Sequence, residues 1–340
     1  MEADISLCME RDPDFFALAR ARGHGRTLVA ELEDRIVACG SVCRRTAYLM
    51  GEPSEMGHVA DVKVDSQFRR VGLARRIMDE IALGESEGTP APYVGTAAAG
   101  NTATDAMVKR FGEGRTLFRL GEFTSYQLLP LLRYRVASGL EIGRAEPRDE
   151  CELVEFLDAY HRRYSFAPVF RDGGFTKLLD RSPGMELGSY RIARRRGRIL
   201  ASVAVWDESA VKQSRLCRMN ARLRWMSRLM RTVGKVLPLP PFPAEGELLR
   251  FVYLRHPAFA DRAIDALAGL VRSTVNELLS QRLHFALFTC ADGDPIAQCI
   301  RGITRSSYHY GLLAGSNAPA YESSLSRFRG AVLYDDAALS

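Results

Sequence analysis

The second half of this 340-residue sequence repeats the element order of the first half, which restricts the chain to a duplicated architecture. Arg198-Ile-Leu-Ala matches Arg35-Ile-Val-Ala 163 positions earlier, and Val205 matches Val42 at the same offset. Both matches lie in the second strand of a predicted β-hairpin that follows a strand and a helix. A few shared residues are weak evidence alone, but the agreement in element order favours an internal duplication.

Apolar residues in the first half alternate where strands are predicted and recur every three or four positions where helices are predicted. The predicted strands are 5–9, 27–32, 35–42, 48–50, 58–64, 93–97 and 125–132, and the predicted helices are 15–20, 71–83 and 104–111. In the second half the predicted strands are 140–144, 190–194, 198–205, 248–254, 285–289 and 308–313, and the predicted helices are 147–164 and 261–279. The fold class is therefore α/β, with a mixed sheet flanked by helices in each half.

The two predicted domains span residues 1–136 and 140–340. The strand 248–254 fits 59–64 only at an offset near 190, about 27 residues more than the hairpin offset of 163. This difference predicts an insertion at about 210–245 in the second domain.

Composition excludes several classes of protein. Apolar residues make up 46% and charged residues 26% of the chain, which is typical of globular domains and not of disordered or fibrous chains. No run of 18 apolar residues predicts a membrane-spanning helix, and Glu2 and Asp4 after Met1 argue against a secretory signal. The seven cysteines are scattered and lack a Cys-x-x-Cys pair, so we expect no disulfide framework, no metal site and a reducing, cytoplasmic location.

The net charge of +6 comes from one segment. Residues 212–235 hold eight Lys or Arg and no acidic residue, so the rest of the chain is slightly acidic and nucleic-acid binding is not expected. An apolar stripe at helical spacing runs through this segment at Leu216, Met219, Leu223, Met226, Met230 and Val233. The commoner meaning of such a stripe is a helix packed on its own domain. The alternative is an interfacial helix that binds anionic lipid, or a surface that binds an acidic acceptor.

The segment 58–74, with sequence HVADVKVDSQFRRVGLA, is a predicted strand followed by a short loop and a helix. Its first helical turn contains Arg69-x-x-Gly72-x-Ala74. The first amides of a helix lack intrahelical acceptors and carry partial positive charge, so they bind anions. Gly72 and the small Ala74 let a phosphate oxygen approach the backbone, and nearby arginines add positive charge.

This segment resembles the signature Arg/Gln-x-x-Gly-x-Gly/Ala of the GCN5-related N-acetyltransferase (GNAT) superfamily. The downstream element Asn101-x-x-Thr104-x-x-Met107-Val-Lys-Arg-Phe-Gly112 resembles a second element of that family. The resemblance implies two tandem GNAT-like domains, the first of which binds acetyl-CoA or another acyl-CoA. It implies coenzyme contacts at Val62, Lys63, Val64, Arg69, Arg70, Val71, Gly72, Leu73, Ala74, Asn101 and Met107.

The resemblance also implies candidate catalytic residues. The family often places a general base at the position of His58, whose imidazole titrates near pH 6.5 and can accept an ammonium proton. The simpler interpretation is a half-buried polar strand residue. Asp61 lies on the opposite strand face unless a bulge, which this family has, turns it. Val108 stands where many members carry an acidic Tyr, and it cannot protonate a thiolate.

In the second half, the 190-residue offset aligns Gly72 with Arg262, so we expect that domain to have lost its coenzyme site. The sequence thus predicts an acyl-CoA-dependent N-acyltransferase (EC 2.3.1) that transfers an acetyl group directly to an amine acceptor, without a metal. One alternative is a non-catalytic acyl-CoA-binding sensor or scaffold. The other is a peripheral-membrane acyltransferase that uses residues 212–235.

Overall fold

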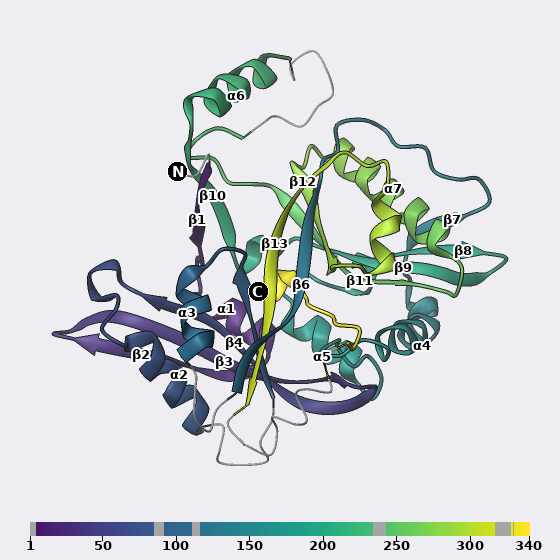
Figure 1. The fold of residues 1–340 in the computed structure, drawn as a ribbon. Coiled ribbons are helices and arrows are strands. Elements are labelled where there is room, and N and C mark those ends of the chain that lie inside the picture. Colours follow the sequence, from purple (N-terminus) through teal and green to yellow (C-terminus); the bar gives the residue numbers. More distant parts are fainter. Residues whose placement is uncertain (1–4, 85–91, 111–115, 234–242, 317–327, 329) are drawn as a thin grey trace. The chain divides into compact units, whose positions relative to one another are not determined.

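The computed structural model describes residues 5–84, 92–110, 116–233, 243–316, 328 and 330–340 (Figure 1). The chain packs into two compact units, each assembled from separate stretches of sequence. The α2 unit contains residues 19–124, 162–169 and 309–340, and the α7 unit contains residues 1–18, 125–161 and 170–308. The domain boundary expected between residues 136 and 140 was inferred from the duplication along the sequence, and it stays a prediction.

In the α2 unit, the sheet has the strand order β2-β3-β4-β5-β13-β6. These strands are β2 (His24–Leu32), β3 (Arg35–Leu49), β4 (Glu52–Val64), β5 (Tyr93–Ala98), β13 (Arg305–Ser316) and β6 (Thr116–Leu128), of which the last two also have residues in the α7 unit. Strand β4 is antiparallel to β3 and parallel to β5, so the sheet is mixed. The helices are α1 (Ala17–Arg22), α2 (Leu73–Gly84) and α3 (Thr102–Arg110).

Helix α2 covers one face of this sheet with an apolar stripe. Ile77 and Ile81 are 5% and 1% exposed and pack with Val42 and Val59 of the sheet. A Cβ at Gly40 would lie 2.5 Å from Cγ2 of Ile77, so the bare glycine backbone lets the helix approach the sheet this closely. The opposite face of β3 is next to α1, because the buried Cys43 thiol donates to the carbonyl of Ala19 over 3.3 Å.

The α7 unit contains a second mixed sheet segment with the order β12-β11-β9-β8-β7. Its strands are β7 (Glu141–Arg144), β8 (Tyr190–Arg195), β9 (Arg198–Trp206), β11 (Phe251–Phe259) and β12 (Phe285–Ala291). Its helices are α4 (Glu150–His161), α5 (Gly174–Arg181), α6 (Ala221–Val233) and α7 (Ile264–Ser280). A separate two-stranded sheet pairs β1 (Ile5–Glu10) with β10 (Gln213–Met219).

The duplication is visible in the strand register. Ala38 pairs with Val64 in the α2 unit, and Ala201 pairs with Phe259 in the α7 unit. The register then shifts in both pairs of strands, next to a residue with positive φ: Asp61 at 57° in β4 and His256 at 51° in β11. Two copies of one strand pair with the same bulge support the internal repeat.

This register corrects the alignment made from sequence. The hairpin offset of 163 holds, but β4 and β11 align at an offset of 195 rather than 190, and the insertion is correspondingly longer. The predicted strand 248–254 ends too early, since residues 256–259 are the end of β11, and α7 begins at Ile264 rather than at 261. The bulge explains the error, because His256-Pro257 interrupts the alternation that identifies a strand.

Several other element predictions differ from the structure at their boundaries. Strand β4 already begins at Glu52, within the expected loop 51–54, and β6 begins at Thr116 rather than at 125. Helix α5 was not predicted. The expected helical stripe from Leu216 is divided, since Leu216 and Met219 lie on strand β10 and α6 starts at Ala221.

Cys8 and Cys217 form a disulfide bond between β1 and β10, with their Cα atoms 5.9 Å apart. The expectation that the scattered cysteines stay unpaired is therefore wrong for these two. Their separation of 209 residues explains why spacing gave no signal. No helix among the described residues is long and apolar enough to cross a membrane, and the cytoplasmic location stays a prediction.

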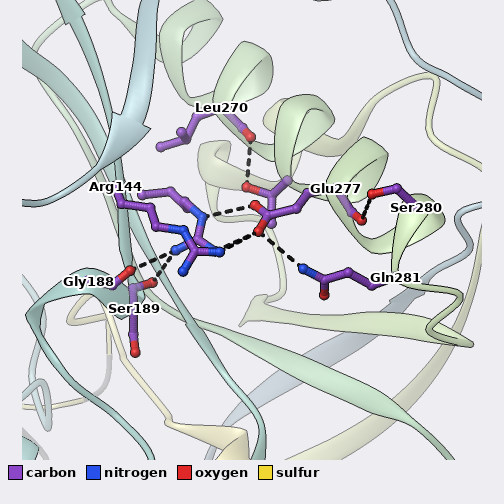
Figure 2. A network of polar contacts seen from close by, with 9 residues as sticks. Arg144, Gly188, Ser189, Leu270, Glu277, Ser280 and Gln281 are labelled. Atoms are coloured by element: carbon purple, nitrogen blue, oxygen red, sulfur yellow. Dashed lines mark hydrogen bonds and ion pairs between the residues drawn. The ribbon is translucent and has the colours of Figure 1, made fainter.

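A network of charged side chains ties α7 to the neighbouring sheet. Figure 2 shows Glu277 of α7 facing Arg144, and both of its carboxylate oxygens also accept hydrogen bonds from Arg191, at 2.9 and 3.0 Å. The guanidinium of Arg191 additionally donates to the carbonyls of Gly188 and Ser189. The hydrogen bond from Arg191 has the largest effect on the pKa of Glu277. Together with the charge of Arg191 and the hydrogen bond and charge of Arg144, it outweighs burial and lowers this pKa from 4.5.

We expect Glu277→Gln to lower the free energy of unfolding at pH 7 by about 1–2 kcal/mol, because partly exposed charged hydrogen bonds are lost. A carboxylate with a lowered folded-state pKa stabilises the protein above its unfolded pKa and loses this effect as the pH falls. Urea unfolding at pH 7 and below pH 4.5 should therefore show the difference shrinking in acid. Asp265→Asn is the control, because Asp265 lies on the same helix as Glu277 and is an exposed ion-pair partner of Arg195. We expect it to have little effect on the free energy of unfolding at either pH. A Glu277 effect that persists in acid would contradict this explanation.

Candidate active site

The bulge in β4 turns two candidate residues toward the α1 side of the sheet. Val59 packs against α2, and beyond the bulge Val62 and Val64 pack there as well. His58, the cross-strand neighbour of Cys43, lies on the other face. Asp61, the residue in the left-handed conformation, points to Arg22 at the end of α1. One extra residue thus places both polar side chains on one face, as the expected bulge allows.

His58 is buried, and its side chain is 1% exposed. Among the described residues, neither ring nitrogen has a hydrogen-bond partner. Burial and the nearby cations Arg45 and Arg22 lower the pKa of His58 well below 6.5, while Asp336 and Asp61 act in the opposite direction. The imidazole is therefore neutral at pH 7 and can accept a proton.

Asp61 is held by a buried ion pair. Its Oδ2 lies 2.5 Å from Nη1 of Arg22, and the two side chains are 7% and 1% exposed. Nε of Arg22 also donates to the carbonyl of Leu339 at 2.5 Å. The nearby Lys63 is mostly exposed and lies 3.7 Å from Asp61. Fixed in this way, Asp61 acts on His58 through its charge and is a less suitable proton acceptor than the neutral imidazole.

Three charged residues near His58, namely Arg22, Arg45 and Asp336, were not identified from the sequence, nor was Asp335, which interacts with Asp336 and Arg45. Asp335 is buried and accepts a hydrogen bond of 2.6 Å from the hydroxyl of Tyr310, which stacks on Phe123. Burial raises the pKa of Asp335 to about 6. These residues come from both ends of the α2 unit's sequence, and no local pattern connects them to residue 58.

Strands β4 and β5 pair over only two positions. Gly57 pairs with Tyr93 and His58 with Val94, and the parallel register between these described strands goes no further. On its other edge, β4 stays paired with β3 up to Val64. His58 therefore lies at the last β4–β5 pair, and the following residues of β4 have backbone groups on an edge that β5 does not pair.

The loop between β4 and α2 has the features of an anion site. Asp65 accepts from the amide of Gln67 and caps a short 3₁₀ helix, Ser66–Phe68, and Arg70 has a φ of 69°. Gly72 has a φ of 89°, immediately precedes α2, and would have nothing within 4 Å of an added Cβ. The backbone is thus open to a ligand at the N-terminus of a 12-residue helix.

Most of the remaining residues predicted to contact coenzyme fall into two groups, and Ala74, Asn101 and Met107 lie in or next to helices. Arg69, Arg70 and Val71 are exposed on this loop, whereas Val62, Val64 and Leu73 are partly buried against the α2 core. Ala74 lies in the first turn of α2. Asn101 caps α3, because its side-chain oxygen accepts from the amide of Thr104 at 3.2 Å. Met107 lies on α3, and its side chain is outside the described part of the structure.

The site contains an open helix N-terminus for an anion and a neutral buried base, joined by one bulged strand. No group of three or more His, Cys, Asp or Glu suited to a metal occurs among the described residues. Val108 packs against the core and offers no acid. An open helix N-terminus can bind an anion, and a neutral imidazole can accept a proton.

Comparisons with known proteins agree with this fold. Residues 8–98 match the model of the family described as Acetyltransferase (GNAT) domain. N-myristoyltransferase of Saccharomyces cerevisiae with bound myristoyl-CoA aligns with a TM-score of 0.60 at 11% identity, over 94% of this chain and 73% of that chain. No curated protein matches the sequence.

Two bacterial structures align more weakly. A GCN5-related N-acetyltransferase from Anabaena variabilis has a TM-score of 0.50 and 8% identity, over 88% of this chain and 66% of that one. A conserved protein from Enterococcus faecalis, described as a probable N-acyltransferase, has a TM-score of 0.51 and 10% identity, over 91% and 72%. At these identities the structures show the fold alone.

The fold is that of the N-acyltransferases built on mixed GNAT sheets, which confirms the predicted fold class. Residues 8–98 match a GNAT acetyltransferase domain, which confirms the resemblance seen in the motif and supports the predicted class of acyltransferase.

Proposed function

We propose that this protein transfers an acyl group from acyl-CoA to an amine, with the coenzyme pyrophosphate bound by the loop Arg69–Ala74. The observation that carries the proposal is Gly72, whose φ of 89° and open surroundings expose the amides at the start of α2. The exposed Arg69 and Arg70 add positive charge beside them. Phosphate binding at such a helix terminus needs these features together.

In this proposal the thioester lies along β4 where β5 no longer pairs, and His58 accepts the proton of the attacking amine. A nitrogen–carbon bond forms, the carbon–sulfur bond breaks, and the thiolate leaves with the electron pair. A thiol with a pKa of ~8.5 is a good leaving group, so Val108 in place of an acid is compatible with turnover. Arg45, Asp336 and the Asp61 carboxylate fixed on Arg22 set the charge around His58.

The acetyl group was predicted from sequence, but the chain length of the acyl group is open. The structural neighbour from S. cerevisiae is described with bound myristoyl-CoA, so longer acyl groups belong in the same experiment.

Calorimetry with free CoA, acetyl-CoA and myristoyl-CoA tests the site. We expect micromolar or tighter binding, roughly −8 kcal/mol, by the wild type. Gly72→Glu should bind at least about 30-fold more weakly, because it places bulk and negative charge at the N-terminus of α2.

The matched control is Gly197→Glu, at a glycine in the β8–β9 turn that also has positive φ and open surroundings. It should bind as the wild type does. Equal binding by wild type and Gly72→Glu, or no binding by either, would exclude the proposed site. Binding without turnover across an amine panel would instead favour the non-catalytic sensor or scaffold.

A further inference from the structure

Helix α6 of the α7 unit has its polar side turned toward the protein. Ser227 is 2% exposed and donates to the carbonyl of Pro243 at 3.1 Å. Arg224 forms an ion pair with Glu245 at 2.9 Å, and Arg231 forms one with Glu247 at 3.2 Å. These three residues, at positions i, i+3 and i+7, lie along one side of the helix.

The other side of α6 presents large apolar side chains to solvent. Trp225 is 66% exposed and Leu229 is 46% exposed. They are four positions apart and so are neighbours on the helix surface. Arg222 and Arg228, both exposed, lie beside them on the same surface. These two side chains lie outside the apolar stripe predicted from sequence, of which Leu223 is half-buried and the side chains of Met226, Met230 and Val233 lie outside the described part of the structure.

Strand β1 adds exposed apolar side chains next to the start of this helix. Ile5, Leu7 and Met9 are 42%, 49% and 67% exposed. Ile5 pairs with Met219, two residues before α6 begins, and the Cys8–Cys217 bond joins the two strands. Soluble proteins rarely leave several large apolar side chains exposed along one continuous element without a partner.

We propose that α6, together with the adjoining end of β1, is a docking surface for an anionic membrane. Charge complementarity identifies the occupant, because the exposed Arg222 and Arg228 lie beside Trp225 and Leu229, whereas Arg224 and Arg231 on the other side of the helix are paired with glutamates. A tryptophan and a leucine between arginines are typical of helices that lie in the headgroup region, where the rings insert and the guanidinium groups meet lipid phosphates. A membrane bound at this surface would hold a lipid-embedded acyl donor or acylated product close to the protein.

The intrinsic fluorescence of Trp225 reports membrane binding without an added label. The chain has two tryptophans, and Trp206 is fully buried, with its Nε1 donating to the carbonyl of Pro183 at 2.9 Å. A change in emission on mixing with vesicles therefore reports Trp225. We would titrate the full chain with phosphatidylcholine vesicles, with and without about one third phosphatidylglycerol, at about 0.1 M salt. Vesicle flotation gives an independent measure of binding.

The expected result is a blue shift and flotation with the anionic vesicles, both weakened at least about tenfold by omission of phosphatidylglycerol. Arg222→Glu/Arg228→Glu should lose at least about tenfold in vesicle affinity, and Trp225→Ser/Leu229→Ser should lose flotation. The matched control is Arg196→Glu/Arg198→Glu, which reverses the same charge at exposed positions of the β8–β9 turn and should bind as the wild type does.

Absence of binding to anionic vesicles overturns the proposal. So does an equal loss in the control pair, because that result would mean a general response to net charge. Soluble polyglutamate is the competing ligand: if it shifts Trp225 emission while the vesicles do not, the surface binds an acidic polypeptide instead. Circular dichroism and CoA affinity that match the wild type show that each variant is folded.

Discussion

Replacement of His58 by glutamine is expected to lower kcat for acyl transfer by about 10²–10³, with CoA affinity unchanged. General-base groups contribute this much when they are positioned at the reacting amine. Glutamine retains the size and polarity of the imidazole, so the fold should persist, but it cannot accept a proton. Initial rates with a saturating amine, beside calorimetry with CoA, separate the loss of chemistry from a loss of binding.

The pH profile distinguishes this role from a structural one. Burial, then Arg45 and Arg22, lower the pKa of His58, whereas Asp336 and Asp61 oppose them. The acid limb of kcat/KM in the wild type should therefore lie below pH 6.5, and it should vanish in His58→Gln. The control is His256→Gln, at the bulge of β11, where the imidazole Nδ1 meets the hydroxyl of Tyr190 at 3.0 Å. It should change kcat less than about threefold.

A rate that survives in His58→Gln would mean that another group accepts the proton. Asp335 is then the next candidate, since burial raises its pKa to about 6 and it lies among the charges that surround Arg45. Its acid limb would lie near pH 6, and the limb would move when its hydrogen-bond donor is removed by Tyr310→Phe.

The strand–loop–helix at residues 58–74 could be predicted from sequence because its information is local. Alternation identifies β4, the apolar spacing identifies α2, and Gly72 marks a backbone turn between them. The structure has these elements, with α2 beginning two residues later than predicted. The proposed anion site depends only on this stretch, so a short motif is enough to predict its position.

The surroundings of His58 could not be predicted in the same way. The bulge at Asp61 depends on pairing between β3 and β4, and Arg22 and Asp336 reach the site only through tertiary packing. The repeat shows the same limit. The bulge at His256 interrupts the alternation along β11, so sequence alone aligned β4 and β11 at an offset five residues short of the one that the strand register gives.

Loss of the Arg22–Asp61 ion pair is expected to be the largest stability effect in the α2 unit. Asp61→Ala leaves the guanidinium of Arg22, which is 1% exposed, without its counter-charge. Removal of one partner from a buried pair typically costs about 3–5 kcal/mol of unfolding free energy, because an uncompensated charge stays in the interior. Urea unfolding at pH 7 measures the loss.

Two further variants separate burial from the mere presence of an ion pair. Glu52→Ala removes an exposed partner of Arg162 at 3.0 Å and should change stability by about 0–1 kcal/mol. Arg22→Met/Asp61→Leu removes both charges and should recover most of the stability lost in Asp61→Ala. If Asp61→Ala were as mild as Glu52→Ala, the pair would be hydrated rather than buried. Arg22→Met/Asp61→Leu would then be no more stable than Asp61→Ala. Arg22 would also no longer count as one of the two cations that lower the pKa of His58.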